Sequence, residues 1–343
     1  MLTLRDMAKE RSKQATIRDV ARLAGVAPIT ASRALQKPDM VKEKTRLKVR
    51  KAADELSYIP NLVAGMLASN VSNMVAVIVP NLSNSIFADT LQSIAAVLRP
   101  QGYHLLIGHC DYSSEQEEEL LRTFLSRRAD AVVLTGLSHS EGTRALIRSS
   151  RVPTVEMWSV TDQPLGVCVG ISNHDAAYSM TRYLIGKGRR NIGFIGGHVQ
   201  NNDRAQSRLQ GYLDALAEHG LPADDQRIAF ANFEYHDGAR AMNRLLEADP
   251  ALDAVFAASD VLATGALQAC LRRNVKVPET VAIAGMDDAG IAQVMTPALT
   301  TISVPRQEIG RKVAEVILSM LRGEQPASTV FDMGFQLVER DTT

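Results

Sequence analysis

The sequence has few cysteines and no long hydrophobic run. Its 343 residues include three cysteines, Cys110, Cys168 and Cys270, whose wide spacing matches no zinc motif and suits a reducing cytoplasm. The longest apolar run, MVAVIVP, is too short to cross a bilayer, and the first residues, MLTLRDMAKERSKQAT, lack the apolar stretch of a signal peptide. We therefore expect a cytoplasmic protein without membrane contact and without bound metal, in which Cys110 and Cys168 are packed inside.

Motifs of common enzymes are missing as well. No G-x-G-x-x-G opens a helix, and the chain has neither a G-x-x-x-x-G-K-[ST] phosphate loop nor a G-x-S-x-G nucleophile elbow. The seven histidines show no H-x-x-x-H or H-E-x-x-H spacing. The acidic pair Asp287 and Asp288 follows a strand-like run, where α/β sheets bind ligands, but no nucleophile and base accompany it. These absences argue against an enzyme and against a cofactor.

The net charge of the whole chain is zero, but its two parts carry opposite net charges. Residues 1–70 hold 14 basic and 7 acidic side chains, a charge of +7. Since the chain has 38 of each sign, residues 71–343 hold 24 basic and 31 acidic side chains, a charge of −7. A basic head on an acidic body is the distribution that binding to a DNA phosphate backbone requires, and it predicts an affinity that falls with salt.

The head contains a proline inside a helix-like run, TIRDVARLAGVAPITASRALQ, at residues 16–36. Gly25 stands where a first helix would end, and Pro28 fits the first position of a second helix, where a missing N–H costs nothing. Two short helices joined by a turn predict a helix-turn-helix, although any small three-helix domain has such a turn. Apolar spacing predicts a third helix within residues 41–56, with Pro60 ending it.

Beyond residue 70, short β-rich runs alternate with amphipathic helices, which predicts an α/β fold with doubly wound parallel sheets in two lobes. Strands are expected at 74–80, 104–110, 131–136, 153–158, 168–172, 192–196, 226–231, 253–258, 281–286, 299–304 and 335–340. Helices are expected at 86–99, 115–127, 174–187, 204–219, 236–248, 261–273 and 306–322.

Several segments occur in a fixed order along residues 16–340. They are TIRDVARLAGV, TASRAL, TRLKV and ADELSYIPN in the head, and ASDVLATGAL, VPETVAIAGMDD and PALTTISVP in the body. In these segments the chain resembles the lac repressor family of bacterial transcription regulators. Within that family, NSIFAD and AQVM are similar to repressors of gluconate utilisation.

The resemblance implies a division of the chain into a head, a hinge and a core like a periplasmic binding protein. The helix-turn-helix domain would span 1–60 and a hinge helix 61–70. The N-terminal effector subdomain would comprise 71–170 and 301–330, and the C-terminal one 171–300 and 331–343. It also implies a homodimer on a palindromic operator, with each hinge becoming helical only when paired on DNA.

Position by position, the resemblance assigns base reading to the second helix of the head. Pro28 and Ile29 match positions that read operator bases, here by apolar contact because neither side chain can hydrogen-bond. Arg33 has the clearest physical basis, since a guanidinium can make two bonds to guanine O6 and N7. Thr30 and Ser32 match further backbone- and base-contacting positions.

Other DNA contacts are implied around the second helix and in the hinge. Thr16 fits both a helix cap and a phosphate contact. Tyr58 matches a DNA-contacting position, and Asn61 and Ala64 match hinge positions that face the minor groove. Leu67 matches an apolar wedge that opens a base step, the alternative being packing against the partner's hinge.

The resemblance also implies an effector cleft between the lobes. Arg208 matches a cation that binds the effector, and Asp287 matches an acceptor for its hydroxyls. Trp158 and Phe233 match ring-stacking or wall positions, with plain core packing as the alternative. The wall would be completed by Phe87, Thr135 and Ser259.

Basic residues near one helix start favour an anionic effector. Arg204, Arg208 and His198 lie close together in the sequence, and a bidentate arginine–carboxylate pair is a strong, charge-assisted interaction. For Arg204 the alternative is a solvated surface position. A sugar acid such as gluconate is therefore expected first, followed by a ketogluconate or a phosphorylated gluconate derivative.

These observations predict a repressor of carbohydrate-catabolism genes that a small sugar acid releases from its operator. The alternatives are a regulator that uses a different sugar, a purine or a phosphorylated co-repressor, an activator, and, in another class, an enzyme or a transport-binding protein.

Overall fold

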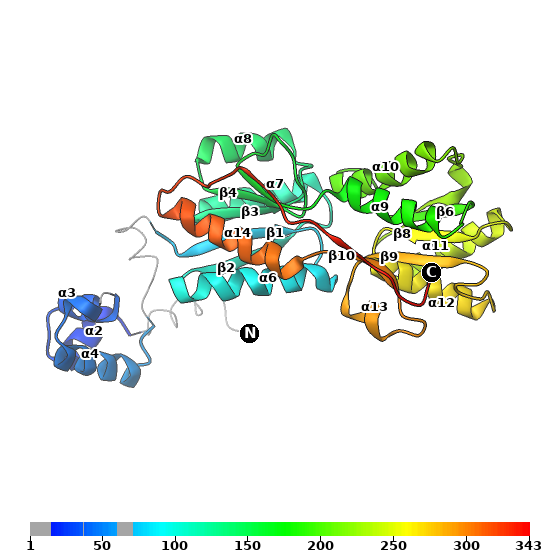
Figure 1. Ribbon diagram of the computed structural model, residues 1–343. Helices are drawn as coiled ribbons and strands as arrows, with labels where there is room; N and C mark the ends of the chain where they lie inside the picture. Colours follow the sequence, from blue (N-terminus) through cyan, green and yellow to red (C-terminus); the bar gives the residue numbers. More distant parts are fainter. Residues whose placement is uncertain (1–14, 37, 60–70) are drawn as a thin grey trace, which may run out of the picture. The chain divides into compact units, whose positions relative to one another are not determined.

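The computed structural model describes residues 15–36, 38–59 and 71–343 (Figure 1). Contacts divide the chain into two compact units, Met1–Val71 and Ser72–Thr343. We call them the head and the core. The expected hinge at 61–70, including Asn61, Ala64 and Leu67, lies outside the described residues, as does Pro60.

The helix-turn-helix expected in the head is confirmed. Helix α2, Ile17–Ala24, ends at Gly25, whose left-handed φ of 65° lets its N–H bond the last carbonyls of the helix. Helix α3, Pro28–Gln36, begins at the proline, so Pro28 opens a second helix. Thr16 caps α2 as expected: its hydroxyl accepts a bond from the Asp19 N–H, and the Asp19 carboxylate accepts one from the Thr16 N–H.

A third helix completes the head. Helix α4, Glu43–Glu55, follows a short 3-10 turn, η1, at Pro38–Met40, and ends several residues before the expected stop at Pro60. Small residues on the three helices let them pack closely around one core, which consists of Val20, Ala21, Ala31, Ala34, Val49, Ala52 and Ala53.

The first lobe of the core is a parallel sheet in the order β11-β5-β4-β3-β1-β2. Along β1, Val75, Val77 and Val79 face one helix layer, whereas Ala76 and Ile78 face the other, because side chains alternate along a strand. Helices α6 and α14 form the first layer, and α7 and α8 the second (Figure 1). The elements are β1 Met74–Val79, α6 Ser85–Leu98, η2 Arg99–Gln101, β2 His104–His109, α7 Ser114–Ser126, β3 Ala131–Thr135, α8 Glu141–Ser150, β4 Thr154–Met157, β5 Val167–Gly170, α14 Arg306–Leu321 and β11 Val330–Asp332.

The second lobe repeats this architecture in the order β12-β10-β9-β8-β6-β7, in which only β12 is antiparallel to its neighbour. Helices α9 and α10 pack together, as do α11 and α12. The elements are α9 Asn173–Gly186, β6 Ile192–Gly196, α10 Asp203–Glu218, η3 Asp225–Arg227, β7 Ile228–Phe230, α11 Tyr235–Ala248, β8 Ala254–Ala257, α12 Asp260–Arg272, β9 Ala282–Asp287, α13 Gly290–Val294, β10 Thr300–Ser303 and β12 Gln336–Val338.

The chain crosses between the lobes three times, after β5, after β10 and after β11. The first crossing follows Gly170, as the expected boundary has it. The other two come slightly later than the expected boundaries at 300 and 330. Strand β10 pairs with β9 of the second lobe as far as Ser303, and β11 pairs with β5 of the first lobe as far as Asp332.

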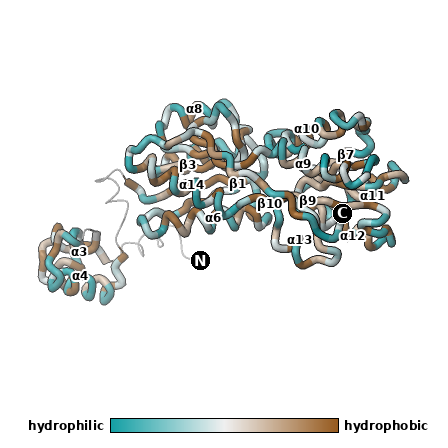
Figure 2. The backbone as a smooth tube through the Cα atoms, in the orientation of Figure 1, coloured by the Kyte–Doolittle hydropathy of each residue, from teal (hydrophilic) through white to brown (hydrophobic). Residues whose placement is uncertain are grey.

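Apolar residues gather in the strands of both lobes, with polar residues along the outer helices (Figure 2). The three cysteines are buried free thiols, which confirms the packing expected for Cys110 and Cys168. The α8 helix and the β11 strand are not among the expected elements. Within the described residues, no helix combines the length and apolar character needed to traverse a lipid bilayer.

Close packing of α9 on α10 depends on a glycine. A Cβ atom on Gly211 of α10 would overlap the carbonyl oxygen of His174 in α9. A Cβ atom on Gly186, the last residue of α9, would meet no described atom within 4 Å. We expect Gly211→Ala to lower the stability of the core by about 1–3 kcal/mol, the usual cost of overpacking. Gly186→Ala should be neutral or slightly stabilising, because alanine is the better helix former.

Calorimetric unfolding of the two full-length variants measures the difference. Equal midpoints for Gly211→Ala and Gly186→Ala would contradict the close approach of the two helices.

Candidate functional site: a pocket between the lobes and the second helix of the head

A pocket between the lobes brings together seven of the eight residues expected to contact an effector. We call it the central pocket. The first lobe contributes Asn84, Ile86, Phe87, Tyr112 and Trp158, and the second contributes Asn202, Arg204, Ala205, Arg208, Phe233, Ser259 and Asp287. Most of these residues follow the carboxyl ends of parallel strands, where open α/β sheets bind ligands.

The eighth expected residue, Thr135, faces a neighbouring cavity, which we call the side chamber. Arg204 and Tyr112 line both cavities and so form the wall between them. The side chamber is lined by Ile78, Pro80, Cys110, Tyr112, Ser113, Ser114, Glu117, Thr135, Ser138, Asn201 and Arg204. Each cavity measures about 20 Å³, room for little more than a water molecule.

Arg208 is buried and held on two sides. Its Nε donates to Asn173 Oδ1 at 2.8 Å, and its Nη1 donates to the Ala258 carbonyl oxygen at 2.7 Å. Its Nη2 lies 4.0 Å from Asp287 Oδ1, too far for a direct hydrogen bond. Burial lowers the pKa of Arg208, although the Asp287 charge opposes this. An oxygen atom of a ligand could therefore bridge the two side chains.

Two buried polar atoms of the central pocket, Trp158 Nε1 and Asp287 Oδ1, have no hydrogen-bond partner among the described residues. Burial raises the pKa of Asp287 to about 6, against the charges of Arg208 and Arg306. An unpaired buried donor or acceptor is costly, so such atoms in a pocket indicate where a ligand binds.

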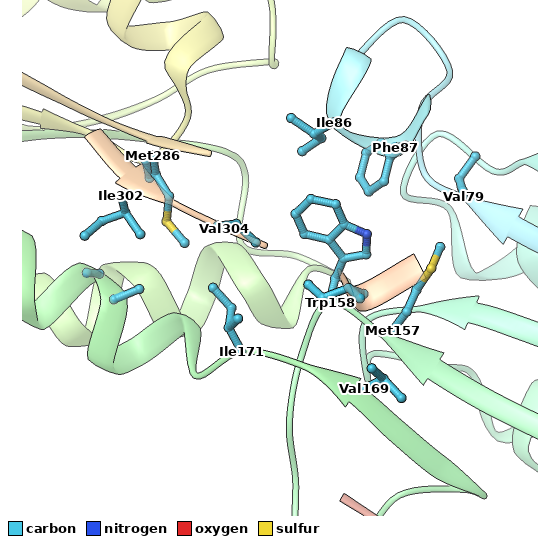
Figure 3. Close-up of a cluster of buried hydrophobic side chains, with 14 of the residues drawn as sticks. Val79, Ile86, Phe87, Met157, Trp158, Val169, Ile171, Met286, Ile302 and Val304 are labelled. Atoms are coloured by element: carbon cyan, nitrogen blue, oxygen red, sulfur yellow. The ribbon is translucent and has the colours of Figure 1, made fainter. Parts of the chain in front are cut away.

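Trp158 belongs both to the hydrophobic core and to the lining of the central pocket. The two roles suggested by the sequence, core packing and a place in the pocket wall, therefore do not exclude each other. Only 1% of its surface is exposed, and its ring meets Phe87 edge-on, with centroids 5.5 Å apart. Figure 3 shows the indole pointing toward Phe87 and Ile86, near Val304. The carbonyl oxygen of Trp158 accepts a bond from Asn173, the residue that also holds Arg208.

Arg204 is buried, with 7% of its surface exposed, so it is not a solvated surface residue. Its Nη1 lies 3.4 Å from Asp203 Oδ1. Asp203 in turn joins the lobes, because it accepts bonds from the Leu137 N–H at 2.9 Å and the Ser159 hydroxyl at 2.6 Å. Burial raises the pKa of Asp203, but the Arg204 charge and these bonds outweigh it and hold that pKa below its usual value.

Tyr112 is the main pocket residue that sequence analysis missed. Its ring stacks on that of Phe233 from the other lobe, with centroids 5.8 Å apart and 30° between the planes. Burial raises its pKa, opposed by the nearby charges of Arg204 and Arg208. Its position in the sequence could have identified it, because Tyr112 comes just after β2, at the same sheet edge as the other pocket residues.

His198 does not join the two arginines in the central pocket. It stacks on Phe230, with centroids 6.5 Å apart, and lines an open depression on the second lobe. It also lines a larger depression between the lobes, about 330 Å³ in volume, which shares Tyr112, Asn202 and Phe233 with the central pocket. The expected basic cluster is therefore reduced to Arg204 and Arg208.

A buried charge network lies behind the side chamber. His139 Nδ1 is 2.8 Å from Glu117 Oε1, and His139 Nε2 is 3.4 Å from Glu156 Oε1. Burial lowers the pKa of His139, but bonds to the two carboxylates outweigh burial and raise it to about 9. In the described parts of the chain, no group of three or more His, Cys, Asp or Glu side chains could hold a metal ion.

In the head, the exposed face of α3 carries the residues expected to read bases. Pro28, Ile29 and Arg33 are exposed, and Ile29 shows 60% of its surface, while Ala31 and Ala34 point into the core. Thr30 and Ser32 are half-buried, Thr16 is exposed, and Tyr58 packs partly against the head core. A helix with an exposed apolar and cationic face suits insertion into a major groove.

A three-helix head with this helix face and a two-lobed core with a polar pocket define a DNA-binding regulator controlled by a small molecule. Comparison with known families agrees. Residues 16–61 match "Bacterial regulatory proteins, lacI family", and residues 72–336 match "Periplasmic binding proteins and sugar binding domain of LacI family". The chain belongs to the lacI family of bacterial regulatory proteins. It is a DNA-binding transcription regulator, not an enzyme.

Individual proteins support this assignment. The HTH-type transcriptional regulator GntR of Pseudomonas aeruginosa is 39% identical over 344 residues, which cover 100% of this chain and 99% of that protein. The HTH-type transcriptional repressor CytR of Escherichia coli is 34% identical and covers 98% of both chains. A lacI-family regulator from Silicibacter pomeroyi has a TM-score of 0.89 and 34% identity, covering 96% of this chain and 99% of that one.

The His139 network predicts a pH dependence of stability. Because the folded pKa of about 9 exceeds the value of 6.5 for free histidine, the network stabilises the core fully below pH 6.5. This stabilisation, on the order of 3 kcal/mol, is lost as the pH rises through 9. Calorimetric midpoints of the core should fall over this window in the wild type and much less in His139→Gln.

The exposed His109→Gln is the matched control and should keep the wild-type slope. An unchanged slope in His139→Gln would show that the network does not bind a proton on folding.

Proposed function

We propose that the chain is a homodimeric repressor of carbohydrate-catabolism genes. A sugar acid, gluconate or a close derivative, would bind in the central pocket and release the repressor from a palindromic operator. The observation that carries this effector class is the presence of two buried arginines beside an unpaired carboxylate oxygen and an unpaired indole N–H. Arginine suits the carboxylate of the acid, and Asp287 suits its hydroxyls. Relatives named GntR and a repressor, CytR, support the proposal.

In this proposal the effector lies beside contacts that join the two lobes, where it can act on their arrangement. Arg306 donates to the Asp89 carboxylate at 3.0 Å and also to the carbonyl oxygen of Asp287 in the pocket. Asp203 adds the bonds to Leu137 and Ser159. A cavity of about 20 Å³ is too small for a sugar acid, so the lobes or their side chains must shift to admit one. A ligand that favours one arrangement changes the population of both.

The DNA-binding side of the proposal assigns operator contacts to Thr16, Pro28, Ile29, Thr30, Ser32, Arg33 and Tyr58, with Asn61, Ala64 and Leu67 in the hinge. Exposed apolar side chains on the core support a second copy of the chain. They include Ile107 and Phe230 on edge strands, and Ile291 and Val294 on α13.

An operator gel shift with and without gluconate tests the proposal. Gluconate should dissociate the wild-type complex. Arg208→Ala should still bind the operator but no longer respond, because the buried cation that binds the carboxylate is gone. Arg182→Ala, an exposed position on α9, is the matched control and should respond like the wild type.

Titration calorimetry of the same proteins measures gluconate binding independently of the operator. Undiminished gluconate binding by Arg208→Ala would refute the assigned role of Arg208. A complex strengthened by gluconate would instead identify a co-repressor.

Arg33→Ala tests the head. Loss of a bidentate contact to guanine should weaken operator binding by about 1–3 kcal/mol and relax the preference at that base pair. Fluorescence anisotropy with the operator and with single-base variants measures both effects. If the variant weakened every duplex equally, Arg33 would be a phosphate contact instead of a base contact.

A further inference from the structure

The side chamber differs from the central pocket in the kind of groups it offers. Three of its lining hydroxyls, those of Thr135, Ser113 and Ser114, have their single proton committed to protein acceptors. Thr135 donates to the Ile78 carbonyl oxygen at 2.9 Å, and Ser113 and Ser114 donate to the Glu115 carboxylate at 2.9 and 3.2 Å. A hydroxyl whose proton is committed offers only lone pairs. These groups can therefore accept from a ligand hydroxyl but give nothing to an anionic oxygen.

The buried charges behind the chamber also favour an uncharged ligand group over an anionic one. Glu117 lines the chamber with 6% of its surface exposed, and it shares His139 with Glu156. Two carboxylates with one imidazole leave a net negative charge even when His139 carries a proton. The cation of the chamber wall, Arg204, faces Asp203 at 3.4 Å, and in the proposed function its charge is also shared with the carboxylate at the other end of the ligand. A second anion in this chamber would meet uncompensated negative charge in a buried setting, which is unfavourable.

The side chamber lies next to the central pocket. Arg204 and Tyr112 line both cavities, so a ligand that spans the two must displace one of these side chains. A ligand whose carboxylate lies at Arg208 and Arg204 would extend its chain past this wall. A closed sugar ring is too compact to reach both cavities, whereas an open chain can.

We propose that the side chamber is a second subsite of the effector pocket, which accepts the uncharged, hydroxyl-bearing end of an open-chain sugar acid and rejects a second anionic group. The proposal rests on the proposed function and narrows its effector to monoanionic, open-chain acids. It disfavours diacids and acids phosphorylated at the far end.

Titration calorimetry of the full-length protein with D-gluconate and D-glucarate tests the proposal, because the two differ only in the far end of the chain. Glucarate should bind at least about tenfold more weakly, since like charges placed together are costly. Glu117→Gln should reduce the ratio of gluconate affinity to glucarate affinity several-fold. Glu119→Gln, at an exposed position on the same helix, should leave this ratio unchanged.

A second variant keeps the test valid if Glu117→Gln fails to fold. Ser138 lines the chamber and is half-buried, so Ser138→Ala is a mild change. It should weaken gluconate several-fold but leave the four-carbon acid erythronate unaffected, because the shorter chain does not reach the chamber.

The outcomes separate the two proposals. If gluconate binds and glucarate binds equally well, or if Ser138→Ala weakens gluconate and erythronate alike, the subsite is refuted and the sugar-acid effector stands. If neither six-carbon acid binds to protein that still binds its operator, the sugar-acid effector itself is refuted, and the subsite with it.

Discussion

The burial of Arg208 is the constraint on which the central pocket depends. A guanidinium taken out of water is destabilising unless its donors are satisfied, and here one side chain and one backbone carbonyl satisfy two of them. The remaining nitrogen faces Asp287 across 4.0 Å, and burial of that carboxylate raises its pKa. The two side chains are thus close enough to interact electrostatically but too far apart to form a direct hydrogen bond. That separation keeps the site polar, charged and able to bind a ligand.

Backbone strain is concentrated around the same site. Tyr112, Trp158 and Asp287, with φ values of 60°, 77° and 112°, are non-glycine residues in left-handed conformations, and all three line the central pocket. Such conformations cost energy and persist where the surrounding structure enforces them. Trp158 follows β4 directly, Tyr112 follows β2 after a short turn, and Asp287 is the last residue of β9. The strain therefore acts where the chain leaves the sheet edge and turns into the cleft.

Much of the fold could be predicted from the sequence because it is encoded locally. Gly25 and Pro28 define the helix-turn-helix, and the alternation of apolar runs with amphipathic segments indicates two parallel sheets. The β11 strand escaped prediction because three half-buried or exposed residues carry no periodic signal, and its partner β5 lies far away in sequence. The α8 helix was missed within a polar, serine-containing segment, where only Thr143 and Ile147 are buried.

The site was predictable only in part, for a related reason. The residues of the pocket could be inferred from resemblance, but the burial of Arg204 depends on packing between the lobes, and the position of His198 depends on its stacking on Phe230 of another strand. No local pattern reports that packing. Likewise, Thr135 looks like any strand-end residue in the sequence, yet the Arg204 and Tyr112 side chains place it in a separate cavity. The stacking of Tyr112 on Phe233 joins residues more than a hundred positions apart.

The charge distribution limits how an effector can control such a regulator. The head carries a charge of +7 in residues 1–70, so its attraction to DNA phosphates is present whether or not the pocket is filled. An effector bound in the central pocket, as proposed above, would not change the number of basic side chains in the head. It can only change which arrangement of the lobes is populated, and to do so it must bind the two arrangements with different affinity. Regulation must therefore act on the specific operator contacts, while salt-dependent, non-specific binding stays largely unaffected.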